Sequence, residues 1–292
     1  MAPLTPAALE GLQLGPVSAT VDGERVGAFV AATGDDPARW VDVAPPGYAA
    51  ALLFRVADEF LWDPALAEAR RTLLHVDQTF AYRGPIRVGA SLSIRGRIER
   101  VRARPPASFV EFVLEVLDGD VVVVDGTSTF LMSPEPAAEA GEDPGEPPFD
   151  LVASSATPTA PRTLGERDEL DKSVSRWGIL RYGAATGDLN PIHWDHEAAR
   201  AAGLPGVVAH GLLLHAWMSQ LAAAYSELDA PLAFVKTRFR APLRPAVPAR
   251  VVAELRELSS DGRDAAVALS VESEGRSLAT AAATVRLHGE RP

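Results

Sequence analysis

The sequence contains no cysteine among its 292 residues. This absence excludes disulfide bonds, thiolate nucleophiles and zinc sites with cysteine ligands. Basic residues are also scarce, because 28 Lys and Arg stand against 39 Asp and Glu and the formal net charge is -11. A chain with this balance lacks the basic face that nucleic-acid-binding proteins present to phosphates, so we expect no nucleic-acid partner.

Long apolar runs are missing as well. The longest, around residues 211–225, is interrupted by His215, Ser219 and Gln220, whereas a bilayer-spanning helix needs about 20 apolar residues. Met1–Leu9 lacks the charged start and the apolar core of a signal peptide. These absences predict a cytoplasmic protein with no membrane partner.

Proline, by contrast, is concentrated in one segment. Residues 135–161 are rich in Pro, Ala, Glu and Gly and have almost no apolar period, which is typical of a linker. We therefore expect two domains of similar size, at residues 1–134 and 162–292.

The two halves follow the same plan, a helix and then four strands. The helical patterns lie at residues 48–61 and 211–225, and the second is apolar on nearly every side, which requires burial all round. The strand-like runs lie at residues 74–82, 90–101, 109–117 and 121–132, and again at 232–241, 249–258, 265–272 and 277–287. This pattern predicts a duplicated α+β fold, in which each half wraps a curved antiparallel sheet around one long central helix.

The segment with most chemical content is Asp188-Leu189-Asn190-Pro191-Ile192-His193. A short helix is predicted at residues 176–186, and Gly187 ends it. Pro191 fixes its own φ and keeps Asn190 out of the helical region, so the loop is stiff. Asp188 and His193 can then face one small space, which suits a water molecule held for acid–base chemistry.

The same loop also has the pattern of an ordinary surface turn, in which Asp188 caps and His193 is exposed. What favours chemistry is the buried helix that opens at His210-Gly211, within twenty residues of the loop. A helix N-terminus offers unpaired backbone N–H groups and a partial positive charge, which suit a developing oxyanion.

Gly187-Asp188-Leu189-Asn190-Pro191-Ile192-His193, with Ala209-His210-Gly211-Leu212 downstream, resembles the MaoC-like, or hydratase 2, family. This family comprises (R)-specific enoyl-thioester hydratases and 3-hydroxyacyl-thioester dehydratases with the hotdog fold. The resemblance implies a double hotdog that reversibly hydrates trans-2-enoyl thioesters of CoA or acyl carrier protein to (R)-3-hydroxyacyl thioesters. No metal or further cofactor is implied, because the substrate itself carries the CoA or phosphopantetheine.

The resemblance also implies roles for individual residues. Asp188 and His193 would be the catalytic pair, and the backbone N–H of Gly211 would donate to the thioester carbonyl oxygen. Asn190 matches the family's structural asparagine, and we expect His210 to support the oxyanion turn.

The N-terminal half resembles the dehydratase-like first domain of two-hotdog members, on residues 75–80 and 85–89. Its Gly34-Asp35-Asp36-Pro37 departs from the catalytic motif, and Trp40 or a neighbour stands where the histidine should be. We therefore expect this half to shelter the acyl chain without catalysing, which leaves one active site per chain. The side chains expected along an acyl tunnel are Tyr48 or Phe54.

Two further groups have competing interpretations. His193 and His196 form an H-x-x-H pair around Asp195, but the spacing is loose and we expect no metal; His215 is interpreted as a core histidine. A basic set on and after one strand is either a solvated strand face or a clamp for the phosphates of CoA or pantetheine; its members are Lys236, Arg238, Arg240 and Arg244.

Alternative functions remain at this point. A hotdog thioesterase also binds acyl thioesters beside a helix N-terminus, and a non-catalytic acyl-CoA-binding subunit would share the fold. The sequence leaves open the acyl-chain length, the physiological direction and any partner subunit. A homodimer is the expected assembly, since closed twofold pairing is the commonest.

Overall fold

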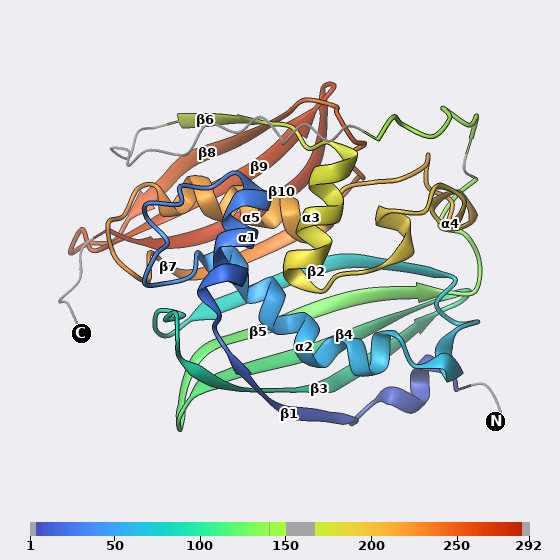
Figure 1. Cartoon of the computed structure of the whole chain (residues 1–292), viewed down its shortest axis with the longest axis horizontal. Helices are drawn as coiled ribbons and strands as arrows, with labels where there is room; N and C mark the ends of the chain where they lie inside the picture. The colour runs from blue at the N-terminus through green and yellow to red at the C-terminus, as the bar shows by residue number, and fades with distance from the viewer. Residues whose placement is uncertain (1–3, 140, 150–166, 288–292) are drawn as a thin grey trace.

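The computed structural model describes residues 4–139, 141–149 and 167–287 of the chain. Its strands form one ten-stranded antiparallel sheet with the order β1-β3-β4-β5-β2-β7-β10-β9-β8-β6 (Figure 1). The N-terminal strands are β1 (Gln13–Thr20), β2 (Thr72–Tyr82), β3 (Ser91–Arg104), β4 (Ala107–Asp118) and β5 (Val121–Ser133). The C-terminal strands are β6 (Arg167–Lys172), β7 (Leu232–Phe239), β8 (Ala249–Leu258), β9 (Asp264–Ser273) and β10 (Arg276–Arg286).

The sheet is symmetric about its centre, where β2 pairs with β7. Outward from that pair, each half presents its strands in the same order, so the topology of one half repeats that of the other. Gln78 lies opposite Thr237 in this central pair, and Asp77 lies opposite Arg238 and forms a 3.0 Å ion pair with it.

The helices repeat in the same way. α1 (Gly23–Thr33) and α3 (Arg176–Thr186) have eleven residues each, and α2 (Ala49–Leu61) and α5 (Gly211–Ala223) have thirteen each. The short helix α4 (His196–Ala201) belongs to the C-terminal half alone. α2 and α5 are the central helices, packed on the strands of their own halves (Figure 1). The predicted duplicated α+β architecture is confirmed.

The central helix of the C-terminal half is buried along nearly its whole length, as its uniform apolarity predicts. The strands begin and end within three residues of the predicted limits. Helix α1 and the two edge strands, β1 and β6, escaped prediction.

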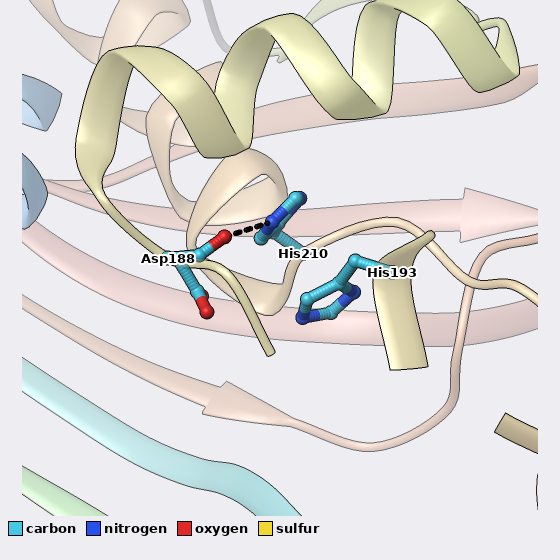
Figure 2. Close-up of side chains that lie close together, drawn as sticks. All are labelled: Asp188, His193 and His210. Carbon is cyan, nitrogen blue, oxygen red and sulfur yellow. Dashed lines mark hydrogen bonds between the residues drawn. The ribbon is translucent and has the colours of Figure 1, made fainter. Parts of the chain in front are cut away.

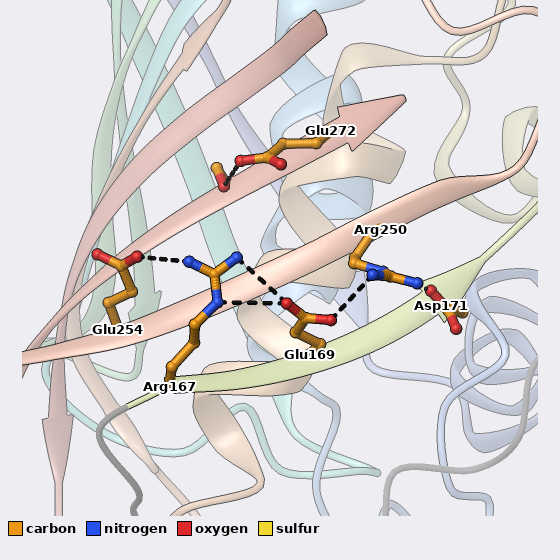
Figure 3. Close-up of polar contacts among 7 residues, drawn as sticks. Arg167, Glu169, Asp171, Arg250, Glu254 and Glu272 are labelled. Carbon is orange, nitrogen blue, oxygen red and sulfur yellow. Dashed lines mark hydrogen bonds and ion pairs between the residues drawn. The ribbon is translucent and has the colours of Figure 1, made fainter. Parts of the chain in front are cut away.

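β6 reads Arg-Asp-Glu-Leu-Asp-Lys, a charged sequence without an apolar face over most of its length. Ion pairs across the edge accompany its pairing with β8 (Figure 3): Arg250 contacts Asp171 at 2.9 Å and Glu169 at 3.1 Å. Arg167 contacts Glu254 at 2.9 Å. Charged side chains on an edge strand discourage pairing with another chain, so the open side of the sheet is protected here.

The first part of the predicted linker is packed against α4 and the turn after it. The backbone N–H of Ala137 donates to Ala202 at 2.9 Å, and Asp143 meets His196 at 3.0 Å. Residues 150–161 lie outside the described residues, and the domain limits stay a prediction. Within the described ranges no helix has the length and apolarity needed to cross a bilayer. The cytoplasmic location and the homodimer also stay predictions.

Candidate active site

The loop after α3 is shaped by two local features. Gly187 ends the helix in the left-handed region, at φ 88°, where glycine lacks the Cβ clash of other residues. Asn190 then caps a short 3-10 helix, Pro191–His193, by accepting from the backbone N–H of Ile192. The amide of Asn190 also donates to the carbonyl oxygen of Leu73 at 3.0 Å. Asn190 therefore ties the loop to β2 of the other half.

His193 is buried, and its hydrogen bond defines its neutral tautomer. Nδ1 lies 2.9 Å from the carbonyl oxygen of Val208. A carbonyl only accepts, so Nδ1 carries the proton and Nε2 keeps a free lone pair. Burial lowers the pKa of His193, and the charge of Asp188 opposes this shift. The ring is therefore a neutral base at neutral pH.

Asp188 is partly buried on the other side of the same small space (Figure 2). Burial raises the pKa of its carboxyl, while His193 and the backbone N–H of Asn190 lower it. The structure thus brings Asp188 and His193 together, as the motif predicts.

His210 braces both members of this pair. Its Nε2 donates to the backbone carbonyl of Asp188 at 3.0 Å, and its ring stacks on that of His193 with centroids 3.7 Å apart (Figure 2). Gly183 makes the contact possible, because a Cβ there would lie 2.9 Å from the Asp188 carbonyl oxygen and 3.3 Å from Nε2 of His210. Sequence reasoning missed Gly183, since a helical glycine alone does not reveal what approaches it.

The donor atoms of Asp188, His193 and His210 lie within 4.8 Å of one another, a spacing that a metal ion can use. One nitrogen of each imidazole donates to a backbone carbonyl, which leaves the other nitrogen of each ring with its lone pair. The rings are, however, stacked with only 27° between their planes, so these in-plane lone pairs do not converge. The arrangement favours an acid–base pair over a metal centre. His196, the other histidine of the H-x-x-H pair, contacts Asp143.

A pocket of about 200 Å³ opens at this pair. Gly211 lines it at the first residue of α5, where backbone N–H groups have no intrahelical partner. The absence of a Cβ on Gly211 also leaves room for the Phe239 ring, which an added Cβ would meet at 3.2 Å. Gly211 therefore has the position expected of an oxyanion donor.

The N-terminal half supplies the opposite wall of the pocket. Its contributions come from α2, β2 and β5, and they are Phe54, Leu61, Trp62, Leu73, Leu74, His75, Val76 and Phe130. Phe54 therefore lines the pocket, and its contact with an acyl chain stays a prediction. Tyr48 does not line the pocket and packs edge-on against Phe29.

The four residues of the predicted basic clamp do not lie at one site. Lys236 and Arg238 are exposed and do not line the pocket, and Arg238 is paired with Asp77. Arg240 does line it. Arg244 lies at a second hollow of about 270 Å³, together with Arg276. This hollow shares Pro242 and Leu243 with the pocket, so the two are neighbours.

The corresponding loop of the N-terminal half holds a buried cation instead of a histidine. Lys172 donates to the carbonyl oxygens of Thr33 and Gly34, each at 3.0 Å. Burial raises the pKa of Asp35, and Lys172 is one of the charges that offset the shift. Trp40 is buried at the position five residues on. No histidine stands between Asp35 and this tryptophan, as predicted.

Comparisons with known proteins agree with both halves. Residues 161–275 match the model "MaoC like domain", and residues 8–125 match "FAS1-like, dehydratase domain region". The chain is 28% identical over 198 residues to 3-hydroxyacyl-thioester dehydratase X of Mycobacterium tuberculosis; the match covers 66% of this chain and 63% of that relative.

Solved structures show the same architecture. A MaoC-like dehydratase superposes with a TM-score of 0.79 at 21% identity, covering 97% of this chain and all of the other. A conserved hypothetical protein of Mycobacterium tuberculosis, described as having a double hotdog fold, superposes with a TM-score of 0.65 at 14% identity, covering 95% of this chain and 96% of the other. At these identities the likeness establishes the fold, and the double hotdog is confirmed.

Proposed function

This chain carries a MaoC-like domain at residues 161–275 and a FAS1-like dehydratase region at residues 8–125, and from that premise we propose that it hydrates trans-2-enoyl thioesters to (R)-3-hydroxyacyl thioesters, reversibly. The observation that carries the proposal is the fixed tautomer of His193. Its free Nε2 lone pair lies beside Asp188 at the opening of α5. The name of the mycobacterial relative, a 3-hydroxyacyl-thioester dehydratase, supports the same chemistry in reverse.

In the hydration direction, Asp188 and Nε2 of His193 orient one water molecule. His193 takes a proton from this water as its oxygen bonds to C3 of the enoyl group, and the C2–C3 π electrons move toward the thioester carbonyl. The N–H of Gly211 donates to the oxygen that becomes negative. The proton then passes from the imidazolium to C2, so one water has been added and His193 is neutral again. The step needs no metal or redox cofactor.

The acid–base pair and the oxyanion donor each contribute a separate factor to the rate. General acid–base catalysis of this kind contributes about 10²–10⁴-fold, and one oxyanion donor about 10²–10³-fold. His210 and Asn190 contribute by holding the loop, since a misplacement of about 1 Å costs on the order of 10²-fold.

The positions of the arginines favour one orientation of the bound substrate. The acyl group would enter the wall formed by α2 and β2, and the pantetheine would leave past Pro242 and Leu243. Arg244 and Arg276 would then meet the phosphates of CoA or of a carrier protein's phosphopantetheine. Arg240 lies between the two ends, and Lys236 and Arg238 take no part.

The test is the hydration of crotonyl-CoA, followed by loss of the conjugated-thioester absorbance. We expect His193→Ala and Asp188→Asn to lose at least about 10²-fold in kcat/KM. Asp195→Asn is the matched control: it removes a carboxylate two residues from His193 but keeps an oxygen to cap α4, where Asp195 accepts from Ala198 at 3.0 Å. Hydration by the first two variants at the wild-type rate would refute the proposal. Release of free CoA thiol would indicate the thioesterase, and binding without turnover the non-catalytic subunit.

A further inference from the structure

The two central helices contact the catalytic loop of the proposed function, residues 188–193, and its inactive counterpart in the N-terminal half, residues 35–40, in equivalent ways. α2 and α5 each have thirteen residues, and Asp58 and Gln220 are the tenth residue of their helices. Gln220 reaches across from the C-terminal half and donates to the carbonyl oxygen of Gly34, at the end of α1, at 2.9 Å. The repeat therefore places Asp58 near Gly187, at the end of α3.

Contacts around Asp58 agree with this placement. A Cβ on Gly187 would lie 3.6 Å from Cβ of Phe54, so this face of α2 packs against the start of the catalytic loop. Asp58 lies one turn further along the same face. Phe54 before it and Trp62 after it both line the pocket. Asp58 is half-buried, and its Oδ1 accepts from the indole N–H of Trp62 at 3.2 Å.

Within the described residues, the groups that act on the Asp58 carboxyl are the charge of Asp188 and the indole of Trp62. Arg70 lies over that indole ring, 5.2 Å from its centroid. Burial raises the pKa of Asp58 to about 7, the neighbouring charge of Asp188 adds to the rise, and the bond from Trp62 opposes it. The charge of Asp188 therefore makes it harder for Asp58 to lose its proton.

We propose that Asp58 is a positioning residue of the active site, contributed by the N-terminal half, which holds a proton beside Asp188 so that the catalytic loop carries a single negative charge. This inference rests on the proposed hydration. When Asp58 loses its proton, a second negative charge appears next to Asp188 in a poorly solvated site. That charge opposes the negative charge that develops on the thioester oxygen, so turnover slows.

The test is the dependence of hydration on pH in Asp58→Asn. In the wild-type protein, kcat/KM is expected to fall by about tenfold as pH rises through about 7, where Asp58 loses its proton; a tenfold fall corresponds to about 1.4 kcal/mol added to the barrier by the new charge. Asn cannot ionise, so the variant is expected to lack this fall and to exceed the wild type at high pH. The change should appear in kcat rather than KM, because the opposed charge on the thioester oxygen develops only during the reaction.

Glu59→Gln is the matched control, because it removes an exposed carboxylate from the next position of α2. This variant is expected to keep the wild-type fall. An Asp58→Asn profile that superposes on the wild-type profile would overturn the inference, as would loss of the fall in Glu59→Gln.

Thermal unfolding supplies a measurement that does not depend on activity. A carboxyl whose pKa is raised in the folded state stabilises that state at low pH, and this contribution is lost as pH rises through the folded pKa. The difference in Tm between Asp58→Asn and the wild type should therefore grow from about pH 5.5 to pH 9. An equal difference at both ends would overturn the inference. Absence of hydration in the wild type would refute the proposed function instead, while this growth would still show that Asp58 holds its proton up to about pH 7.

Discussion

The contact of Gly183 with the catalytic loop makes Gly183→Ala an informative substitution. The helix α3 has no room for even one carbon at this point. The added Cβ would lie 2.9 Å from the carbonyl oxygen of Asp188 and 3.3 Å from Nε2 of His210, the two atoms that hydrogen-bond to each other. Both the loop that carries Asp188 and the ring that stacks on His193 would have to move.

The expected loss of activity follows from the size of that movement. A carbon–oxygen contact of 2.9 Å must open by about half an ångström, and a misplacement of about 1 Å costs on the order of 10²-fold in rate. We therefore expect kcat/KM to fall by about tenfold to a hundredfold. The free energy of unfolding should fall by roughly 0–2.5 kcal/mol, because overpacking costs about 1–3 kcal/mol and Ala gains about 0.5–1 kcal/mol over Gly inside a helix.

The assay is steady-state hydration of crotonyl-CoA with chemical denaturation of the same samples. Gly27→Ala is the matched control: it lies in α1, the equivalent helix, and an added Cβ there has no atom within 4 Å. It should gain about 0.5–1 kcal/mol in the free energy of unfolding and keep wild-type activity. A Gly183→Ala enzyme within about twofold of the wild-type kcat/KM would refute the argument that this contact positions the pair.

Two further predictions concern the hollow at Arg244 and the buried cation beside Asp35. Reversing both Arg244 and Arg276 to Glu should raise KM for CoA thioesters by at least about tenfold, or about 1.4 kcal/mol, with little change in kcat. Arg256→Gln, in β8 and outside the lining of this hollow, is the control. An unchanged KM in the double variant would refute the proposed phosphate contacts. Lys172→Met should lower the free energy of unfolding by about 3 kcal/mol in denaturant titrations, because it removes one of the two cations, Lys172 and Arg39, that offset the buried charge of Asp35. A loss below about 1 kcal/mol would show that this charge is dispensable.

Local patterns carried most of the architecture. The uniform apolarity of residues 211–223 required burial, and the alternation along β3 showed one wet face. The loop at residues 188–193 was recognisable because a glycine, an Asn-Pro turn and two chemically active side chains lie within seven positions. Edge strand β6 was missed, since six mostly charged residues give no period and only their partners in β8 make them a strand.

The sequence alone could not predict which residues from distant strands and helices contact one another. The alternation of Lys236, Arg238 and Arg240 is visible in the letters, but the pairing of Arg238 with Asp77 depends on a strand more than 150 residues away. Asp58 is hidden in the same way, because in α2 alone it belongs to the polar side of an amphipathic helix. Its nearness to Asp188 arises only when the second half folds against the first.

The pairing of β2 with β7 makes one chain out of what resembles a dimer of two hotdogs, and this has a genetic consequence. In an assembly of identical subunits, every substitution appears at both symmetry-related places at once. Here a codon change at position 58 alters the neighbour of the catalytic loop alone, and a change at position 220 alters only its inactive counterpart. Covalent fusion therefore allows an acid, Asp58, in one central helix and an amide, Gln220, at the equivalent position of the other. One half can then be selected for turnover and the other half for folding.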